Sequence, residues 1–242
     1  MSVTLVGGGF SPATNGAVYG QFLRDAATIA ARREDDVAPV PRIAIITVRE
    51  PQALVRHADD LKDALSAAGP FTPRLTTIAE GETVAADAFD DVDGILIGGG
   101  LTPAYLTAIA QHAERIRSLV ESGVPYLGFS AGAAIAPDHA LIGGWRLGGV
   151  EVSREDGSED LDEVTIQPGL GLCDVTVDVH AVQWGNLSRM IAAIDAGMID
   201  DGIAIDENTA LVLETGALKA VGAGTVWLVS RADDGVNVRA VG

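Results

Sequence analysis

The stretch "VPYLGFSAG" (residues 124–132) places a serine between two glycines, directly after a short apolar run. The apolar run predicts a buried strand, and the G-x-S-x-G pattern predicts a sharp turn that lifts the Ser130 hydroxyl clear of a sheet. Glycine suits both flanking positions because a side chain there would clash with neighbouring backbone. Ser130 is therefore a candidate nucleophile, and the alternative is a turn of small residues without chemistry.

Similar apolar runs come earlier in the chain and predict four further strands, at residues 3–9, 42–48, 74–79 and 92–100. Segments with helical periodicity alternate with them, at residues 17–33, 51–69 and 103–123. The strand runs are apolar throughout, which is typical of a parallel sheet covered on both faces. This order of elements predicts an α/β fold, a three-layer α/β/α sandwich with a mostly parallel central sheet.

The later part of the chain differs in its composition and in its pattern of predicted elements. Residues 148–164 are rich in glycine and acidic residues and predict a loop or insertion. After this loop, the pattern predicts strands at 170–180, 203–214, 217–230 and 236–242 and a helix at 184–197. We expect these strands to form a β-rich C-terminal edge of the same sheet. Because no long linker interrupts the pattern, residues 1–242 are predicted to form a single domain.

Composition excludes several classes of function. Asp and Glu number 34 against 16 Lys and Arg, for a net charge of −18, which argues against binding nucleic acid or an anionic membrane surface. A single cysteine argues against a disulfide framework and a multi-cysteine metal site. The glycine-rich segment at 7–16 lacks a full G-x-G-x-x-G, so no dinucleotide cofactor is predicted, and no metal is expected. Without a signal peptide or membrane-spanning run, a cytoplasmic location is predicted.

A nucleophilic serine needs a base, and the chain has four histidines. His57 and His112 fall within predicted helices, where we expect them to face solvent. His139 is expected at the end of the helix after Ser130, too far along it to reach the hydroxyl. His180 closes a predicted strand, and the ends of parallel strands are where catalytic groups gather. His180 is therefore the predicted base.

The orienting acid and the oxyanion donors are less constrained by the sequence. Four carboxylates follow or flank the strand ends near His180, and spacing does not choose among them: Asp174, Asp178, Asp206 and Glu207. The backbone amide of Ala131 follows the candidate nucleophile directly. The "GGG" at 98–100 ends another strand and could supply a second amide to a developing oxyanion.

Taken together, these segments resemble peptidase family S51, which holds aspartyl dipeptidase (peptidase E) and cyanophycinase. That family belongs to the class I glutamine amidotransferase-like superfamily, with a flavodoxin-like sandwich. The matching segments, in family order, are "LVGGG", "ILIGGGLTPAYL", "GFSAGAAI", "GLGLCDVTVDVH" and "GIAIDENTALVL". The resemblance implies a Ser130 nucleophile, a His180 base and an orienting Glu207, with Asp206 as the less favoured acid. It also implies oxyanion donors at Gly99 or Gly100 and at Ala131.

The substrate-binding residues that the resemblance implies are Leu101, Gln183, Trp184 and Arg189. Leu101 stands where the family often has a polar amide residue, and Trp184 departs from the family pattern in "HAVQWGNLSR" (180–189). This stretch holds Arg189 where the family has several arginines, so strong selectivity for acidic peptides is not expected. The acidic segment from Glu151 to Glu163 predicts a preference for basic substrates if it flanks the site, and a solvated loop otherwise.

The sequence thus predicts a serine-type exopeptidase, dipeptidase or isopeptidase that acts on small peptides through an acyl-enzyme. Two alternatives stay open, a non-catalytic binding protein on the same fold and a serine esterase with the same triad. Glutamine amidotransfer is disfavoured because serine, and not cysteine, occupies the turn. The resemblance also implies a homodimer.

Overall fold

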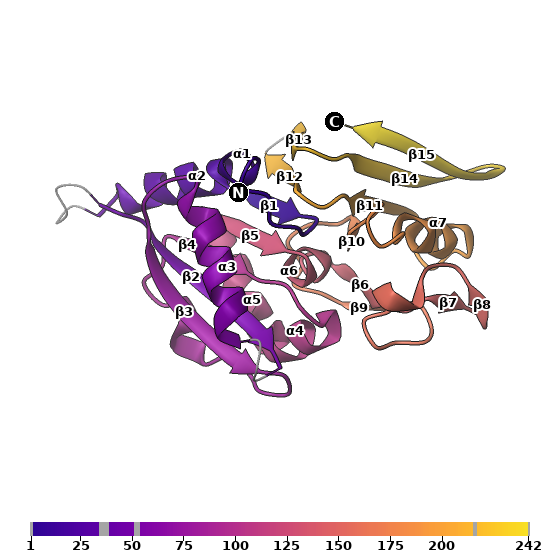
Figure 1. Ribbon diagram of the computed structural model, residues 1–242, viewed down its shortest axis with the longest axis horizontal. Helices are drawn as coiled ribbons and strands as arrows, with labels where there is room; N and C mark the ends of the chain where they lie inside the picture. Colours follow the sequence, from indigo (N-terminus) through magenta and orange to yellow (C-terminus); the bar gives the residue numbers. More distant parts are fainter. Residues whose placement is uncertain (1, 34–38, 51–53, 215–216, 242) are drawn as a thin grey trace.

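A seven-stranded sheet forms the centre of the protein in the computed structural model, which describes residues 2–33, 39–50, 54–214 and 217–241 (Figure 1). Five of its strands are parallel and two antiparallel strands close one edge, in the order β13-β12-β1-β5-β4-β2-β3. The strands are β1 (Val3–Val6), β2 (Arg42–Arg49), β3 (Thr72–Ala79), β4 (Gly94–Ile97), β5 (Tyr126–Phe129), β12 (Thr209–Glu214) and β13 (Ala217–Gly222). A mostly parallel sheet in a mixed α/β fold is therefore confirmed.

Helices cover both faces of this sheet. In β2, Ile43 and Ile45 belong to the core under one set of helices, and Ala44 and Ile46 belong to the core under the other. This alternation explains why the strand is apolar throughout, since both of its faces are buried. The first set is α1 (Asn15–Val18), α2 (Gly20–Ala30) and α3 (Leu54–Ser66), and the second is α4 (Thr102–Ile109), α5 (Ala113–Glu121) and α6 (Ala131–Ala134). Three short 3₁₀ turns lie at Ala86–Phe89, Ala110–His112 and Glu155–Gly157.

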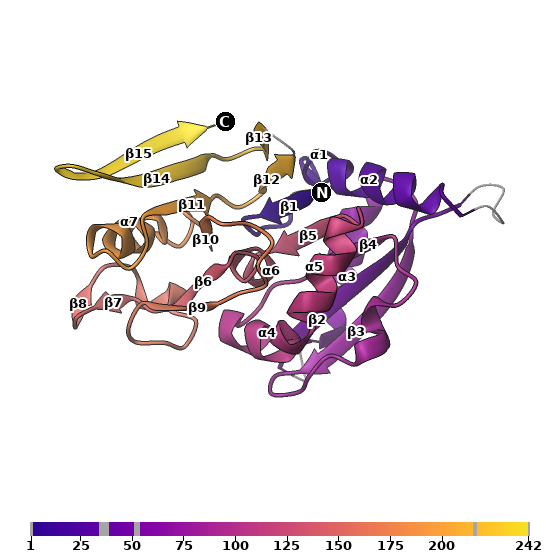
Figure 2. The same cartoon turned by 180° about the vertical axis from the view of Figure 1, so that it is seen from behind.

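A second sheet of four strands stands beside the large one, and α7 (Leu187–Asp195) packs against it (Figure 2). Its strands are β10 (Thr176–Val179), β11 (Asp201–Ile205), β14 (Val226–Ala232) and β15 (Gly235–Val241). The prediction that all late strands extend the first sheet is wrong, because only β12 and β13 do so. The predicted strand 203–214 is two strands, and the chain changes sheets between Ile205 and Thr209, where Asn208 has φ 57°.

The segment after Ser130 also differs from expectation. Helix α6 ends at Ala134, and His139 begins strand β6 (His139–Gly143) instead of ending a helix. Strand β6 pairs with β9 (Thr165–Pro168) in a two-stranded sheet, and β7 (Arg146–Leu147) pairs with β8 (Val150–Glu151). Outside β8 and one 3₁₀ turn, residues 148–164 are loop, as predicted.

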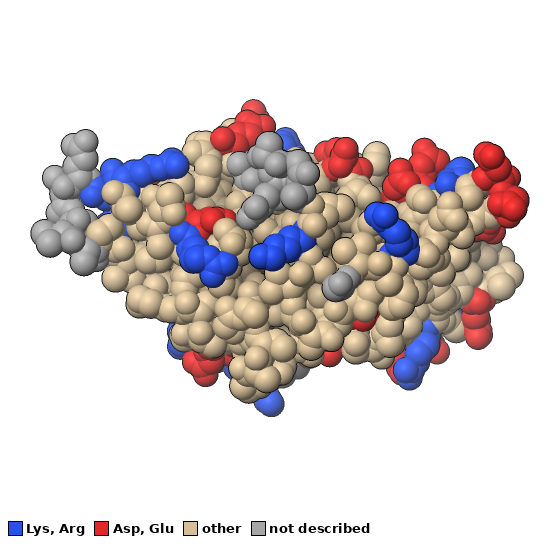
Figure 3. All heavy atoms as spheres, turned by 90° about the horizontal axis from the view of Figure 1, so that it is seen from above, with Lys and Arg blue, Asp and Glu red and all other residues tan. Residues whose placement is uncertain are grey.

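One continuous cluster of buried side chains joins the two large sheets, since Val3 and Leu5 of β1 share it with Val179 and Ile205 of the second sheet. The single domain over 1–242 stays a prediction, and this shared core is in keeping with it. On the face shown in Figure 3, Lys and Arg side chains stand scattered and form no continuous patch. None of the helices in the described ranges is long and apolar enough to cross a membrane.

Candidate active site

Ser130 sits in a sharp turn between β5 and α6, with φ 52° and ψ −112°, a conformation that L-residues rarely adopt. The flanking glycines make this turn possible. A Cβ atom on Gly128 would overlap with the carbonyl of Gly132, and one on Gly132 would overlap with the carbonyl of Ile97. The Ser130 amide donates to the carbonyl of Val6 at 2.9 Å, which fixes the turn to β1. The strained backbone at the end of a parallel strand presents the hydroxyl at the edge of the sheet.

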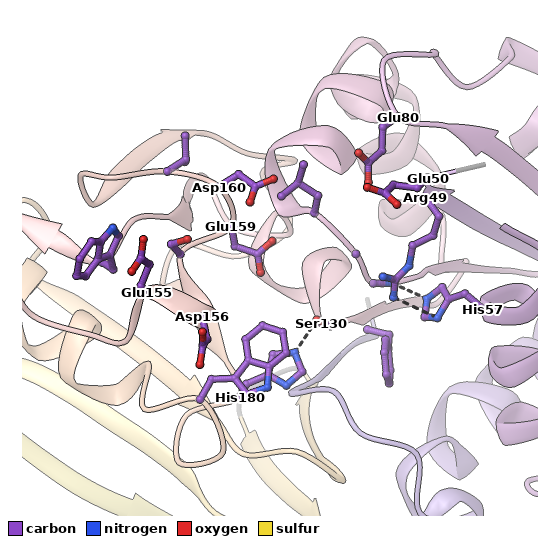
Figure 4. A pocket seen from close by; sticks show the side chains of 18 of the residues that line it. Arg49, Glu50, His57, Glu80, Ser130, Glu155, Asp156, Glu159, Asp160 and His180 are labelled. Atoms are coloured by element: carbon purple, nitrogen blue, oxygen red, sulfur yellow. Dashed lines mark hydrogen bonds between the residues drawn. The ribbon is translucent and has the colours of Figure 1, made fainter. Parts of the chain in front are cut away.

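The Ser130 hydroxyl is hydrogen-bonded to His180, and His180 is hydrogen-bonded to Glu207 (Figure 4). Ser130 Oγ lies 2.8 Å from His180 Nε2, and His180 Nδ1 lies 2.8 Å from Glu207 Oε1. The hydrogen bond to His180 lowers the pKa of the Glu207 carboxyl below its ordinary value. Ser130 comes from the large sheet, whereas His180 and Glu207 follow strands β10 and β11 of the second sheet. The structure therefore brings together three side chains in the order of a nucleophile, a base and an orienting acid.

The other carboxylates considered for the acid lie elsewhere. Asp206 accepts hydrogen bonds from the amide of Thr225 at 2.9 Å and from Trp227 Nε1 at 3.2 Å. Asp178 is paired with Arg189 in the interior. Asp206 and Glu207 are adjacent positions that the sequence could not separate. Of the two, Glu207 is the one hydrogen-bonded to the imidazole in the described part of the chain.

Two of the three backbone amides predicted as oxyanion donors have no hydrogen-bond partner. These are the amides of Gly100 and Ala131, which make no hydrogen bond among the described residues. The amide of Gly99 instead donates to Nε2 of His57 at 3.1 Å. A buried amide without a partner can donate to an oxygen that becomes negative in the transition state. The amides of Gly100 and Ala131 are therefore available to a ligand, while the hydrogen bond from Gly99 anchors the glycine segment.

A pocket of about 910 Å³ opens above Ser130 and His180. Carboxylates line both sides of it, and Glu50 and Glu80 lie on the same side as Arg49, as Figure 4 shows. Arg49 and His57 lie on one side of Ser130. On the other side are four carboxylates of the loop between β8 and β9: Glu155, Asp156, Glu159 and Asp160. In the described ranges, no group of three or more His, Cys, Asp or Glu side chains is arranged to hold a metal ion.

Two titratable groups of the pocket lining, His57 and Glu159, have pKa values that are shifted by burial. Burial, helped by the nearby charge of Arg49, lowers the pKa of His57 to about 4, so the ring is neutral near pH 7. Burial raises the pKa of Glu159, whose Oε2 accepts a hydrogen bond from the amide of Thr102 at 2.8 Å. The acidic loop is thus hydrogen-bonded to the first residue of α4 and forms a wall of the pocket, so it is more than a solvated segment.

The predicted substrate-binding residues divide into two pairs. Leu101 and Trp184 line the pocket. Gln183 and Arg189 do not, because each is held elsewhere. Gln183 Oε1 accepts from the amide of Glu207 at 2.9 Å. Arg189 is 2% exposed, and its guanidinium bonds Asp178 twice, at 2.9 and 2.8 Å, as well as the carbonyls of Gly144 and Gly157.

Sequence reasoning missed Arg49 and misjudged His57 and His112, which are buried and do not face solvent. His112 Nε2 lies 2.8 Å from the carbonyl of Val84. A signal for Arg49 was present, since it directly follows the apolar run "RIAIITV" at the carboxyl end of a parallel strand, where ligands bind in such sheets. Phe10 was also missed, and it stacks on Phe129 with ring centroids 4.7 Å apart at the pocket wall.

In a comparison with protein families, residues 51–221 match the model of peptidase family S51. A cyanophycinase of Trichormus variabilis is 37% identical over 119 residues, 48% of this chain and 37% of that protein. A cyanophycinase of Synechococcus elongatus is 33% identical over 146 residues, 58% of this chain and 42% of that protein. A peptidase E of Shewanella denitrificans is 41% identical over 63 residues, 25% of this chain and 26% of that protein. The matches thus span less than half of these curated relatives.

Solved structures resemble the fold over nearly the whole chain. A peptidase from an acI-B1 actinobacterium superposes with a TM-score of 0.58 at 18% identity and covers 99% of this chain and 96% of that one. A putative peptidase E protein from Listeria monocytogenes superposes with a TM-score of 0.56 at 14% identity, covering 92% of this chain and 98% of that one. At these identities the likeness concerns the fold alone.

Proposed function

Because this chain belongs to peptidase family S51, as the match over residues 51–221 shows, we propose that it is a serine peptidase acting on small peptides. The observation that carries the proposal is the continuous pair of 2.8 Å hydrogen bonds from Ser130 through His180 to Glu207. A serine hydroxyl becomes a useful nucleophile when a histidine accepts its proton and a carboxylate orients that histidine. The proposed triad is therefore Ser130, His180 and Glu207.

In the proposed reaction, Ser130 Oγ attacks the carbonyl carbon of the peptide bond while its proton passes to His180 Nε2. The carbonyl oxygen becomes an oxyanion and accepts hydrogen bonds from the amides of Gly100 and Ala131. His180 then returns the proton to the leaving amine, the C–N bond breaks, and an acyl-enzyme remains. A water molecule, deprotonated by His180, attacks the acyl-enzyme and releases Ser130.

We propose further that preferred substrates carry a positive charge on the side of the scissile bond that faces the acidic loop. Support comes from Glu155, Asp156 and Asp160, which line that side of the pocket, while on the other side Glu50 and Glu80 line it together with Arg49 (Figure 4). Opposite charges across a low-dielectric cleft attract, and like charges repel. The homodimer that the resemblance implies also stays a proposal.

The test is covalent labelling by a fluorophosphonate together with hydrolysis of a dipeptide panel. The parent should be labelled at one site and should hydrolyse at least one peptide, and Ser130→Ala should lose both activities. Ser122→Ala, a change on the surface after α5, is the matched control and should keep both. Equal hydrolysis by Ser130→Ala and the parent would overturn the proposal.

The same experiment separates the competing functions. Labelling together with hydrolysis of esters but of no peptide would indicate an esterase. No labelling at all would favour a binding protein on this fold. For the charge preference, KM for peptides with Arg on one side of the scissile bond should be lower than for the matched peptides with Glu, and the difference should shrink at high salt.

A further inference from the structure

The indole ring of Trp184 lies face to face with the imidazole of His180. The ring centroids are 3.8 Å apart and the planes differ by 7°. A tight turn after β10 produces this contact, because the amide of Trp184 donates to the carbonyl of His180 at 2.9 Å and brings the side chain back over the ring. Trp184 is 36% exposed, so its ring lies between the imidazole and the open pocket.

The His180 ring has further contacts through its two nitrogen atoms and Cε1. Nε2 bonds Ser130, Nδ1 bonds Glu207, and Gly8 approaches Cε1 so closely that a Cβ atom at Gly8 would overlap with it. Among these contacts of the ring, the one with Trp184 is the stacked aromatic contact. The family resemblance does not imply this contact, since Trp184 departs from the family pattern at its position.

We propose that Trp184 is a positioning residue that stabilises the charged form of His180 during proton transfer. When the Ser130 proton moves to Nε2 and Oγ bonds the substrate carbon, the imidazole becomes an imidazolium and the opposite charge appears on the carbonyl oxygen. The electron-rich face of an indole attracts a cation more than a neutral ring. The stacking energy is therefore larger in the transition state than in the resting enzyme, and such a difference raises kcat. This inference rests on the proposed function.

Two carboxylates also act on the charge of this ring, so the test has to leave them in place. Glu207 is hydrogen-bonded to Nδ1, and Glu159 lies close enough for the charge of His180 to act on its carboxyl. Changing Trp184 alone keeps both. Trp184→Phe retains a weaker π face, and Trp184→Leu retains apolar cover without a π face. Val182→Ala, in the same turn and 58% exposed, is the matched control.

The experiment measures the rate of Ser130 labelling by a fluorophosphonate, as a saturating rate constant and a half-saturating concentration, from pH 5 to pH 9. This probe needs the same base but no knowledge of the peptide substrate. In Trp184→Leu we expect the saturating rate to fall about threefold to thirtyfold, with the half-saturating concentration nearly unchanged. Trp184→Phe should lie between Leu and the parent, and Val182→Ala should match the parent.

The pH profile separates this role from simple packing. Without the indole face the imidazolium is less stable, so the acid limb of the rate profile in Trp184→Leu should move to lower pH. A saturating rate and acid limb equal to those of the parent would overturn the inference, and so would Phe being as slow as Leu. If the parent itself is not labelled, or Ser130→Ala is labelled as fast, the proposed function fails and this inference fails with it.

Discussion

Gly99 donates its backbone amide hydrogen to Nε2 of His57, and the two nitrogen atoms lie 3.1 Å apart. Nδ1 of the same ring lies 3.4 Å from Nη2 of Arg49, and both neighbours are donors, so the neutral ring accepts from one of them at a time, from Gly99 at Nε2 or from Arg49 at Nδ1. A protonated ring could not accept from Gly99 and would also face the Arg49 guanidinium. The glycine segment beside Ser130 is thus anchored by a histidine that has to stay neutral, and this has a consequence for stability.

The first prediction concerns pH. Burial and Arg49 lower the pKa of His57 to about 4 in the folded protein, against about 6.5 in the unfolded chain. The unfolded chain therefore binds more protons, and the free energy of unfolding should fall as pH drops from about 6.5 to about 4, by up to about 3 kcal/mol. His57→Gln keeps an acceptor for Gly99 but does not titrate. Urea unfolding at pH 7 and pH 5 should show a smaller loss in His57→Gln than in the parent. Equal losses would contradict this origin of the pH dependence.

The second prediction separates two adjacent carboxylates. Glu207→Gln removes the negative charge beside His180 Nδ1 and should lower the rate of Ser130 labelling by about 10²- to 10⁴-fold, the order of loss in Ser-His-Asp triads. Its free energy of unfolding should change little. Asp206→Asn should change the labelling rate little and lower the free energy of unfolding. Asp206 accepts hydrogen bonds from Thr225 and Trp227 in the interior, and an Asn there would leave a buried donor without a partner, at a cost of about 1–3 kcal/mol. Similar labelling rates in the two variants would count against Glu207 as the orienting acid.

The elements that could be predicted from sequence are those whose pattern is local. The inner parallel strands β1, β2, β4 and β5 are largely apolar because they are buried on both faces, whereas the edge strand β3 is mostly exposed. The turn at Ser130 needs Gly128 and Gly132 close to it in sequence. His180 was found because it ends a strand. Each of these inferences used neighbours within a few positions of the chain.

The features that could not be predicted depend on distant partners. Whether β11 and β12 are one strand depends on two sheets that meet only in the folded protein. Arg189 has the residue type of a substrate anchor, but its partners are Asp178 and the carbonyls of Gly144 and Gly157, which come from separate segments. The periodic pattern predicts that His57 lies on a helix, but it does not predict the hydrogen bond from the Gly99 amide to the His57 ring.

The third prediction follows from this buried arginine. Replacing Arg189 with Met leaves Asp178 charged and unpaired in the interior, and should lower the free energy of unfolding by about 3–5 kcal/mol. The double variant Arg189→Met with Asp178→Leu removes both charges and should recover part of that loss. Arg154→Met, which breaks the exposed pair with Asp156, is the control and should change stability by less than about 1 kcal/mol. Chemical denaturation measures all three, and a loss in Arg189→Met no larger than in the control would refute a structural role.

The last prediction concerns the space beside the base. Gly8 has φ +101°, and a Cβ atom at this position would overlap with Cε1 of His180. In Gly8→Ala the imidazole has to move, and a displacement of about 1 Å breaks its alignment with both Ser130 and Glu207, so the labelling rate should fall by about 100-fold. Gly81→Ala is the matched control, because Gly81 also has a positive φ, +86°, but nothing within 4 Å of the added atom. Both variants carry backbone strain, whereas only Gly8→Ala should lose labelling. Equal labelling in the two variants would mean that the imidazole does not need the space that Gly8 leaves.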